Sequence, residues 1–226
     1  MMADNTALRS AGRTDATAVE KFVASRVKHL QDTRLERGAR GSRTVALLAR
    51  LRRVATAEPG VDLSVWDDTL AGAPGSPDGS SLSKATEQER AIHLALAMYA
   101  TAQQSRTESA HEYGTGLGRA VRRLEGRRPN VGGGDTSPVR RRFDALATSV
   151  TMPELAVHLR GLITQLRGER ITLDYARLAR DLFVYQLPGQ AHTVRRAWAR
   201  DYAAAGARTG RDTTTTTDTT ITNREN

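Results

Sequence analysis

Apolar residues along this chain recur at helical intervals, and this regularity limits the folds available to it. Leu155, Leu159, Leu162 and Leu166, for example, fall at i, i+4, i+7 and i+11. Side chains at this spacing share one face of an α-helix, whereas a half-buried strand would alternate apolar and polar residues. No stretch of the chain shows sustained alternation, so the sequence predicts an all-α protein.

The same periodicity and the positions of helix-capping residues predict where the individual helices lie. Ser137-Pro138 and Thr151-Met152-Pro153 each place a capping residue before an early proline, and Thr172 precedes another periodic run. The expected helices cover roughly residues 19–30, 42–54, 84–104, 117–126, 137–150, 151–168, 172–186 and 194–202.

Gly-, Pro- and Thr-rich stretches divide the chain into two predicted helical bundles with disordered ends. We expect a disordered arm over residues 1–16, an N-terminal lobe over 17–126 and a linker over 127–136. A C-terminal lobe over 137–206 then precedes a low-complexity tail over 207–226, whose repeated threonines cannot form a core.

Several classes of chemistry find no support in the sequence. The chain has no cysteine, and none of its five histidines stands at a spacing typical of metal ligands. Asp174 and Asp181 share a helix face, but ion pairs with nearby arginines explain them better than acid–base catalysis. We therefore predict no enzymatic activity, metal or cofactor. With no apolar run long enough to span a membrane and no signal peptide at the start, we expect a cytoplasmic protein.

Positive charge is concentrated rather than evenly spread. The formal net charge is +9. Between Arg119 and Arg142 there are eight arginines against only Glu125 and Asp135, and a second cluster between Arg43 and Arg53 contains no acid. A guanidinium donates two parallel hydrogen bonds to a phosphate and stays charged at physiological pH. The clusters favour binding to a nucleic-acid backbone, and the scarcity of aromatic residues argues against a base-stacking surface.

Helix geometry assigns different roles to three consecutive arginines in "SPVRRRFDAL". At 100° per residue, Arg141 projects nearly opposite the buried side, while Arg140 and Arg142 lie at its two edges. The expected buried stripe consists of Val139, Phe143, Leu146 and Val150.

Six segments, taken together in this order, resemble the CasB family. They are "LARLRRV", "GLGRAV", "RRRFDAL", "LAVHLRGLIT", "ITLDYARLARDLFVYQ" and "VRRAWARDY", and the resemblance spans about residues 19–203. CasB is the small subunit of Cascade, the type I-E CRISPR interference complex.

The resemblance implies two helical lobes and a non-catalytic subunit present in two copies among other Cascade subunits. It implies that basic residues hold the hybrid of guide RNA and target DNA and the displaced DNA strand, while a separate helicase-nuclease cuts. Phe143, Leu182 and Trp198 match core positions. The backbone contacts implied by position are Arg52, Arg53, Arg119, Arg141, Arg142 and Arg160, with Arg195 and Arg196 as further candidates.

Two other readings of the basic surface remain open from the sequence. Residues 154–180 contain two helices with a short connection, as in a helix-turn-helix transcription regulator, although the second helix offers mainly acidic and apolar residues. The arginines of a purely structural adaptor would instead contact acidic protein surfaces.

Overall fold

The computed structural model describes residues 2–77, 84–128 and 136–214, with side chains over 12–77, 84–128 and 136–206. The described part of the chain contains α-helices and one short 3-10 helix but no strand, which confirms the all-α prediction. The elements are α1 (Met2–Thr33), α2 (Ala39–Arg53), η1 (Leu63–Val65), α3 (Trp66–Thr69), α4 (Glu87–Gln103), α5 (Leu117–Arg127), α6 (Pro138–Thr148), α7 (Met152–Gly168), α8 (Tyr175–Gln186) and α9 (Ala191–Thr214).

Helix α4 forms the centre of the molecule because it is apolar on all sides. Every residue from 91 to 103 is buried, including the predicted stripe of Ile92, Leu96 and Tyr99. A helix that is apolar all round must be covered all round. Helices α1, α2, α7 and α8 provide this cover, and the ring of Tyr99 meets the edge of the Tyr175 ring of α8 at 5.5 Å.

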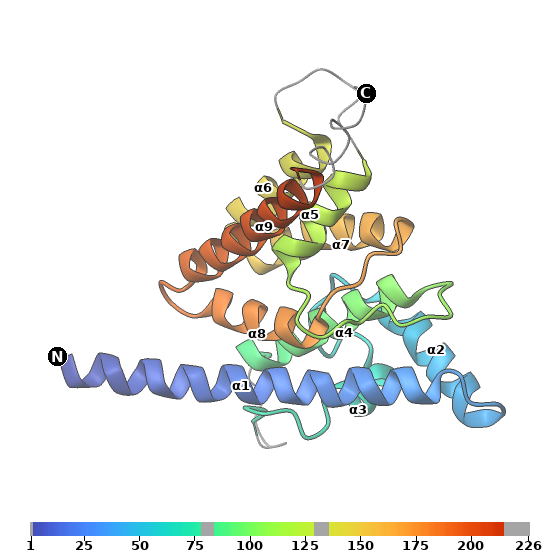
Figure 1. Ribbon diagram of the computed structural model, residues 1–226. Helices are drawn as coiled ribbons and strands as arrows, with labels where there is room; N and C mark the ends of the chain where they lie inside the picture. The colour runs from blue at the N-terminus through green and yellow to red at the C-terminus, as the bar shows by residue number, and fades with distance from the viewer. Residues whose placement is uncertain (1, 78–83, 129–135, 215–226) are drawn as a thin grey trace, which may run out of the picture.

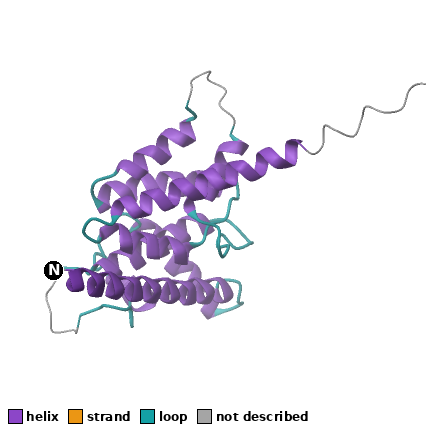
Figure 2. Ribbon diagram, turned by 60° about the vertical axis from the view of Figure 1, so that its left-hand side comes forward, coloured by secondary structure: helices purple, strands orange, loops and turns teal. Residues whose placement is uncertain are grey.

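The helices pack in layers around the α4–α8 pair. Helix α1 lies along both members of the pair, and α2 packs on α4. On the opposite side, α7 packs on α4 and α9 on α8, with α5 and α6 completing that layer (Figure 1). The turned view in Figure 2 shows the same stack, with α1 at its base. A single apolar cluster runs through all layers and includes Phe143, Leu182 and Trp198, so their expected core positions are confirmed.

Capping side chains stand at the starts of α6, α7 and α8. Ser137 and Thr151 accept hydrogen bonds from backbone N–H groups three residues ahead, as the sequence predicts. The cap of α8 is Asp174 instead of the predicted Thr172, which donates to Glu112. A carboxylate accepts two backbone N–H groups at once and suits the positive end of the helix dipole better than a hydroxyl.

The packing does not divide where the sequence suggests a boundary between lobes. Helix α5 of the expected N-terminal lobe packs against α9 and α6, whereas α8 of the expected C-terminal lobe packs against α1 and α4. Residues 129–135, most of the expected linker, lie outside the described residues. The glycine- and proline-rich stretch therefore separates the sequence into two parts whose helices interleave, because each part leaves apolar faces that the other covers.

The helices at both ends extend further than the sequence suggests. Helix α1 begins at Met2, so most of the expected disordered arm continues this helix. Ala16 is buried, and Thr17 donates a hydrogen bond to the Arg13 carbonyl one turn earlier. Helix α9 continues to Thr214, and the rest of the expected tail, residues 215–226, lies outside the described residues.

Helix α6 ends before it can bury the last member of its predicted stripe. Val139, Phe143 and Leu146 are buried, but the helix stops at Thr148 and Val150 is 84% exposed. The prediction that Val150 is buried is therefore wrong, because helical spacing has no meaning beyond the end of a helix.

Candidate nucleic-acid interface

Helix α7 presents one side to solvent, opposite the leucine stripe that packs into the core. The solvent side carries one arginine, Arg160, among small side chains, and Glu154 lies in the first turn, where its carboxylate accepts from the Val150 N–H. At Gly161 a built Cβ atom would meet nothing within 4 Å, so the space above the helix is open there. The exposed residues of α7 are Pro153, Glu154, Val157, Arg160, Gly161, Thr164 and Gly168.

On the flank of α7 that faces α2, the nearest cations are Arg52 and Arg167. Arg167 lies seven residues after Arg160 and therefore on the same side of the helix. It donates a hydrogen bond to Gln104 at the end of α4. Burial, followed by repulsion from Arg167 and Arg53, lowers the pKa of Arg52. The guanidinium groups of two helices are thus brought together without a carboxylate between them.

On the other flank of α7, α6 supplies Arg142. With the Gln165 amide turned so that its oxygen faces this arginine, the amide accepts from Nε at 3.2 Å and Nη1 at 2.9 Å. Further along, Arg128 pairs with Glu169 at 2.7 Å, and its Nη2 would lie 3.5 Å from a Cβ atom built at Gly168. This flank is therefore also basic.

We define the α7 face as Arg52, Arg142, Arg160 and Arg167 around the open side of α7. Within the described residues, none of the four forms an ion pair with a carboxylate. Unpaired guanidinium groups on both sides of a floor of small side chains suit a phosphodiester backbone, which needs donors and close approach.

The remaining arginines expected at the interface fall into two groups. Arg53, Arg141 and Arg196 are exposed, and Arg141 donates to the Thr136 carbonyl at 2.6 Å beside the start of α6. Arg119 and Arg195 instead take part in the fold.

Arg119 reaches Asp201 of α9 at 3.7 Å, and Arg177 of α8 reaches the same carboxylate at 3.8 Å. Arg195 donates at 2.9 Å to both the Ser149 carbonyl and the Tyr185 hydroxyl, and its guanidinium lies over the Tyr185 ring. These two arginines are already bound within the protein.

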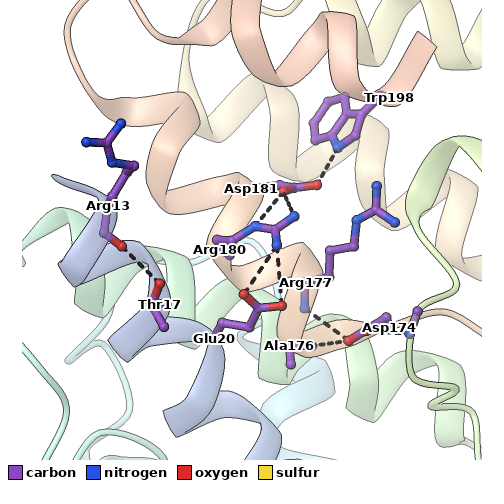
Figure 3. A network of polar contacts seen from close by, with 10 residues as sticks. Arg13, Thr17, Glu20, Asp174, Ala176, Arg177, Arg180, Asp181 and Trp198 are labelled. Carbon is purple, nitrogen blue, oxygen red and sulfur yellow. Dashed lines mark hydrogen bonds and ion pairs between the residues drawn. The ribbon is translucent and has the colours of Figure 1, made fainter. Parts of the chain in front are cut away.

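A buried polar network beside these contacts joins α1, α8 and α9 (Figure 3). The Asp181 carboxylate accepts from Trp198 Nε1 at 2.9 Å and from Arg180 Nη2 at 3.0 Å. Arg180 also reaches Glu20 of α1 at 3.3 Å. The arrangement confirms that ion pairs with arginines account for Asp181, and it links α8 to α1 on one side and to α9 on the other.

Much of the arginine cluster between residues 119 and 142 is balanced by intramolecular ion pairs. Arg122 pairs with Glu125, Arg123 with Glu112 and Arg140 with Asp144. Arg122 and Arg140 also lie over the Tyr202 ring, at 5.3 and 4.9 Å from its centroid. The cluster therefore supplies fewer free cations than its sequence suggests.

Sequence reasoning missed Arg167 because it stands in a stretch of mixed charge. Its spacing of seven residues from Arg160 was the available signal. The approach of Arg167 to Arg52 could not be read from the sequence, since α2 and α7 are far apart along the chain and are brought near each other by packing on α4.

The described residues contain no group of three or more potential metal ligands. The buried His93 has its Nε2 3.1 Å from the Val54 carbonyl, and the half-buried His111 accepts at Nδ1 from the Tyr175 backbone N–H at 3.2 Å. Within the same part of the chain, no helix has the length and apolar character needed to cross a membrane.

Helix α8 does not have the exposure that a DNA-reading helix requires. Eight of its twelve residues are buried, and it packs against α1, α4 and α9. A recognition helix must present its side chains in the major groove. The α7–α8 pair therefore does not form a helix-turn-helix reader.

Comparison with known proteins identifies one matching family and several similar solved structures. Residues 47–202 match the family described as CRISPR-associated protein Cse2. The crystal structure of CasB from Thermobifida fusca is 36% identical, with 82% of this chain and 97% of that chain covered and a TM-score of 0.61.

More distant solved structures share the fold. The crystal structure of M. ruber CasB is 19% identical, with 82% of this chain and 96% of that chain covered and a TM-score of 0.57. A chain of a CRISPR RNA-guided surveillance complex is also 19% identical, with 86% and 99% covered and a TM-score of 0.64. No curated protein matched.

Proposed function

Because the chain belongs to the CRISPR-associated protein Cse2 family, which includes CasB, we propose that it is a non-catalytic subunit of a type I-E Cascade complex. In this proposal it acts in the cytoplasm beside other Cascade subunits and a second copy of itself. Similarity to a chain of an RNA-guided surveillance complex supports the assignment.

The role proposed for the protein is to hold nucleic-acid backbones in the opened target. The single observation that supports this role best is the α7 face, where four arginines without carboxylate partners surround an open helix side. The exposed Arg53, Arg141 and Arg196 extend the basic surface beyond it. The bound strands would be the guide RNA–target DNA hybrid and the displaced DNA strand.

Small contributions from such contacts are sufficient for the proposed role. Replacing a DNA duplex by a guide RNA–DNA hybrid is nearly balanced in free energy, so additional backbone contacts shift the equilibrium towards the open state. Contacts to phosphates are independent of base sequence and weaken as salt concentration rises. The protein would therefore stabilise every matched target to a similar extent.

Charge reversal on the α7 face tests this function. In the assembled complex, Arg142→Glu with Arg160→Glu should weaken target-DNA binding about tenfold or more and reduce the dependence of affinity on salt, because phosphate contacts are lost. The loss should be similar for several guide sequences. Binding is measured by fluorescence anisotropy over a salt series with matched targets.

Two controls make the result specific. A second double reversal, Lys21→Glu with Lys28→Glu, places the same charge change on exposed positions of α1, across the α4–α8 pair from α7, and should leave affinity nearly unchanged. Native mass spectrometry checks that each variant still joins the complex, and in how many copies. Equal weakening by both double variants, or a loss confined to one guide sequence, would contradict the proposal.

A further inference from the structure

A recessed hollow lies where the end of α1, the outer side of α2 and the loop after α4 meet. Its lining combines three arginines, Arg34, Arg52 and Arg106, from three different parts of the chain. Gln103, Gln104 and Ser105 supply polar groups between them, and Val45 and Leu48 form the apolar side. Among the described residues no carboxylate lines the hollow, so the charged groups of its lining are all arginines.

Two of these arginines are held in place by backbone carbonyls. Arg34 Nη1 donates to the Arg106 carbonyl at 3.0 Å, and Arg106 Nη2 donates to the Arg170 carbonyl at 3.2 Å. Arg106 is only 9% exposed, and the Nε groups of Arg34 and Arg106 are buried with no hydrogen-bond partner in the described structure. Carbonyls bind these guanidinium groups without neutralising them.

The electrostatic consequence is a fixed positive potential behind the hollow. Burial lowers the pKa of Arg106 and is the largest effect on it; Tyr175 and Glu108 act in the opposite direction, while repulsion from Arg170 and Arg34 adds to the lowering. Cations gathered in a partly desolvated site repel one another, and this repulsion is relieved when an anion binds among them.

The front of the hollow offers donors that the protein itself does not use. Among the described residues, neither the Arg52 guanidinium nor the Ser105 hydroxyl makes a hydrogen bond. Ser105 also has φ 56°, in the left-handed region that costs free energy for a residue with a side chain. The Gln103 side chain stabilises this loop by donating to the Glu108 carbonyl at 2.8 Å and accepting from the Ala110 N–H at 2.8 Å.

We propose that this hollow is a binding site for one phosphate group. Arg52 and Ser105 donate to the phosphate oxygens, while Arg34 and Arg106 stabilise the charge from behind. A tetrahedral dianion or a phosphodiester accepts from several directions at once, which matches a concave arrangement of arginine and hydroxyl donors. This site shares Arg52 with the proposed α7 face but goes beyond it, because it takes a single phosphate in a hollow instead of a strand along a helix.

A carboxylate introduced at the rim tests the site without disturbing the fold. Val45 is 54% exposed on α2 and lines the hollow, so Val45→Glu places a negative charge where the phosphate would bind. Val45→Gln is the matched control, since it has the same length and no charge. The carboxylate should weaken phosphate binding about tenfold relative to the control, because it repels the bound anion. A tenfold change corresponds to about 1.4 kcal/mol of binding free energy.

Two ligands distinguish the source of the phosphate group. Binding of inorganic phosphate, and of a twelve-nucleotide single-stranded DNA without terminal phosphates, is followed by the arginine Nε–Hε signals in NMR titrations at constant ionic strength. If Val45→Glu but not Val45→Gln weakens the binding of inorganic phosphate, the site takes free phosphate. If it weakens the binding of the oligonucleotide, the site takes a phosphate of a nucleic-acid strand. Either result supports the proposal.

Unchanged binding of both ligands in Val45→Glu would overturn the proposal, as would equal shifts when chloride replaces phosphate in the wild-type protein. Circular dichroism verifies that both variants are folded. The Arg142→Glu, Arg160→Glu variant separates this site from the α7 face, because it should leave the response to inorganic phosphate intact while weakening strand binding.

Discussion

Gly118 is the residue at which α5 and α9 approach most closely. A Cβ atom built there would collide with the Trp198 carbonyl and lie 2.6 Å from the Tyr202 backbone N, so backbone atoms of α9 fill the space that a side chain would need. Only glycine allows this contact, and it brings the arginines of α5 against the acids and aromatic rings of α9.

Two glycines of α5 therefore respond in opposite ways to alanine. Gly118→Ala should lower the free energy of unfolding by roughly 2–3 kcal/mol, because the helices must move apart. Gly126→Ala should raise it by about 0.5–1 kcal/mol, since nothing lies within 4 Å of a Cβ atom there and alanine favours the helix. Urea unfolding followed by circular dichroism measures both. Similar stability changes in the two variants would show that α5 and α9 are not in backbone contact.

At the scale of the element, the start of α8 depends on one carboxylate. Asp174 Oδ1 accepts from the N–H groups of Ala176 and Arg177, and its Oδ2 accepts from the Gly114 N–H at 2.7 Å. The same side chain thus caps a helix and ties it to the loop before α5. A backbone contact from the Asp174 N–H to the Thr115 carbonyl at 2.8 Å completes the junction.

Removing this cap should cost far more than removing the hydroxyl two residues earlier. Asp174→Ala should destabilise the protein by about 2 kcal/mol or more, because three backbone N–H groups lose a charged acceptor. Thr172→Ala should cost less than about 1 kcal/mol, since its hydroxyl makes one partly exposed bond to Glu112. Thermal unfolding of both variants gives the comparison. A larger loss for Thr172→Ala would contradict the assignment of the cap.

The difference between these two residues shows what the sequence could predict about the elements. Periodicity alone predicted α4, α6, α7 and α8, because their apolar stripes are long and regular. It could not select between Thr172 and Asp174, because both residue types cap helices and the choice depends on where Gly114 lies. Likewise, the outward direction of Arg141 followed from helix geometry, whereas the burial of Val150 failed where α6 ends.

At the scale of the whole molecule, the sequence likewise could not determine which arginines of the candidate interface are available. The sequence indicated that arginines are clustered, yet Arg119 is paired with Asp201, while Arg167, beside Arg52, bonds to the Gln104 amide and has no carboxylate partner among the described residues. Which arginines remain available is decided by contacts between distant helices. Charge clusters in the sequence therefore indicate a kind of ligand, but they do not determine which arginines are available to bind it.

The buried His93 and the half-buried His111 make the stability of the whole fold depend on pH. Burial lowers the pKa of His93, although the Val54 carbonyl and Glu58 act in the opposite direction. Burial likewise lowers the pKa of His111, against the opposing effects of Asp174 and the Leu173 backbone.

Both histidines therefore take up protons more readily in the unfolded chain, where the pKa is near 6.5.

The free energy of unfolding should consequently be highest above pH 6.5 and fall as the pH drops from about 6.5 to 5. The slope approaches about 1.4 kcal/mol per pH unit for each histidine that remains neutral in the folded state. Carboxylates with lowered pKa values, such as Glu112, lose their contribution only at still lower pH, so the two effects separate. Urea unfolding at half-unit intervals of pH measures the slope.

Replacing both histidines by glutamine, which can donate to the Val54 carbonyl and accept from the Tyr175 N–H, should flatten the slope even if overall stability falls. A slope that persists in the double variant would assign the pH dependence to other groups.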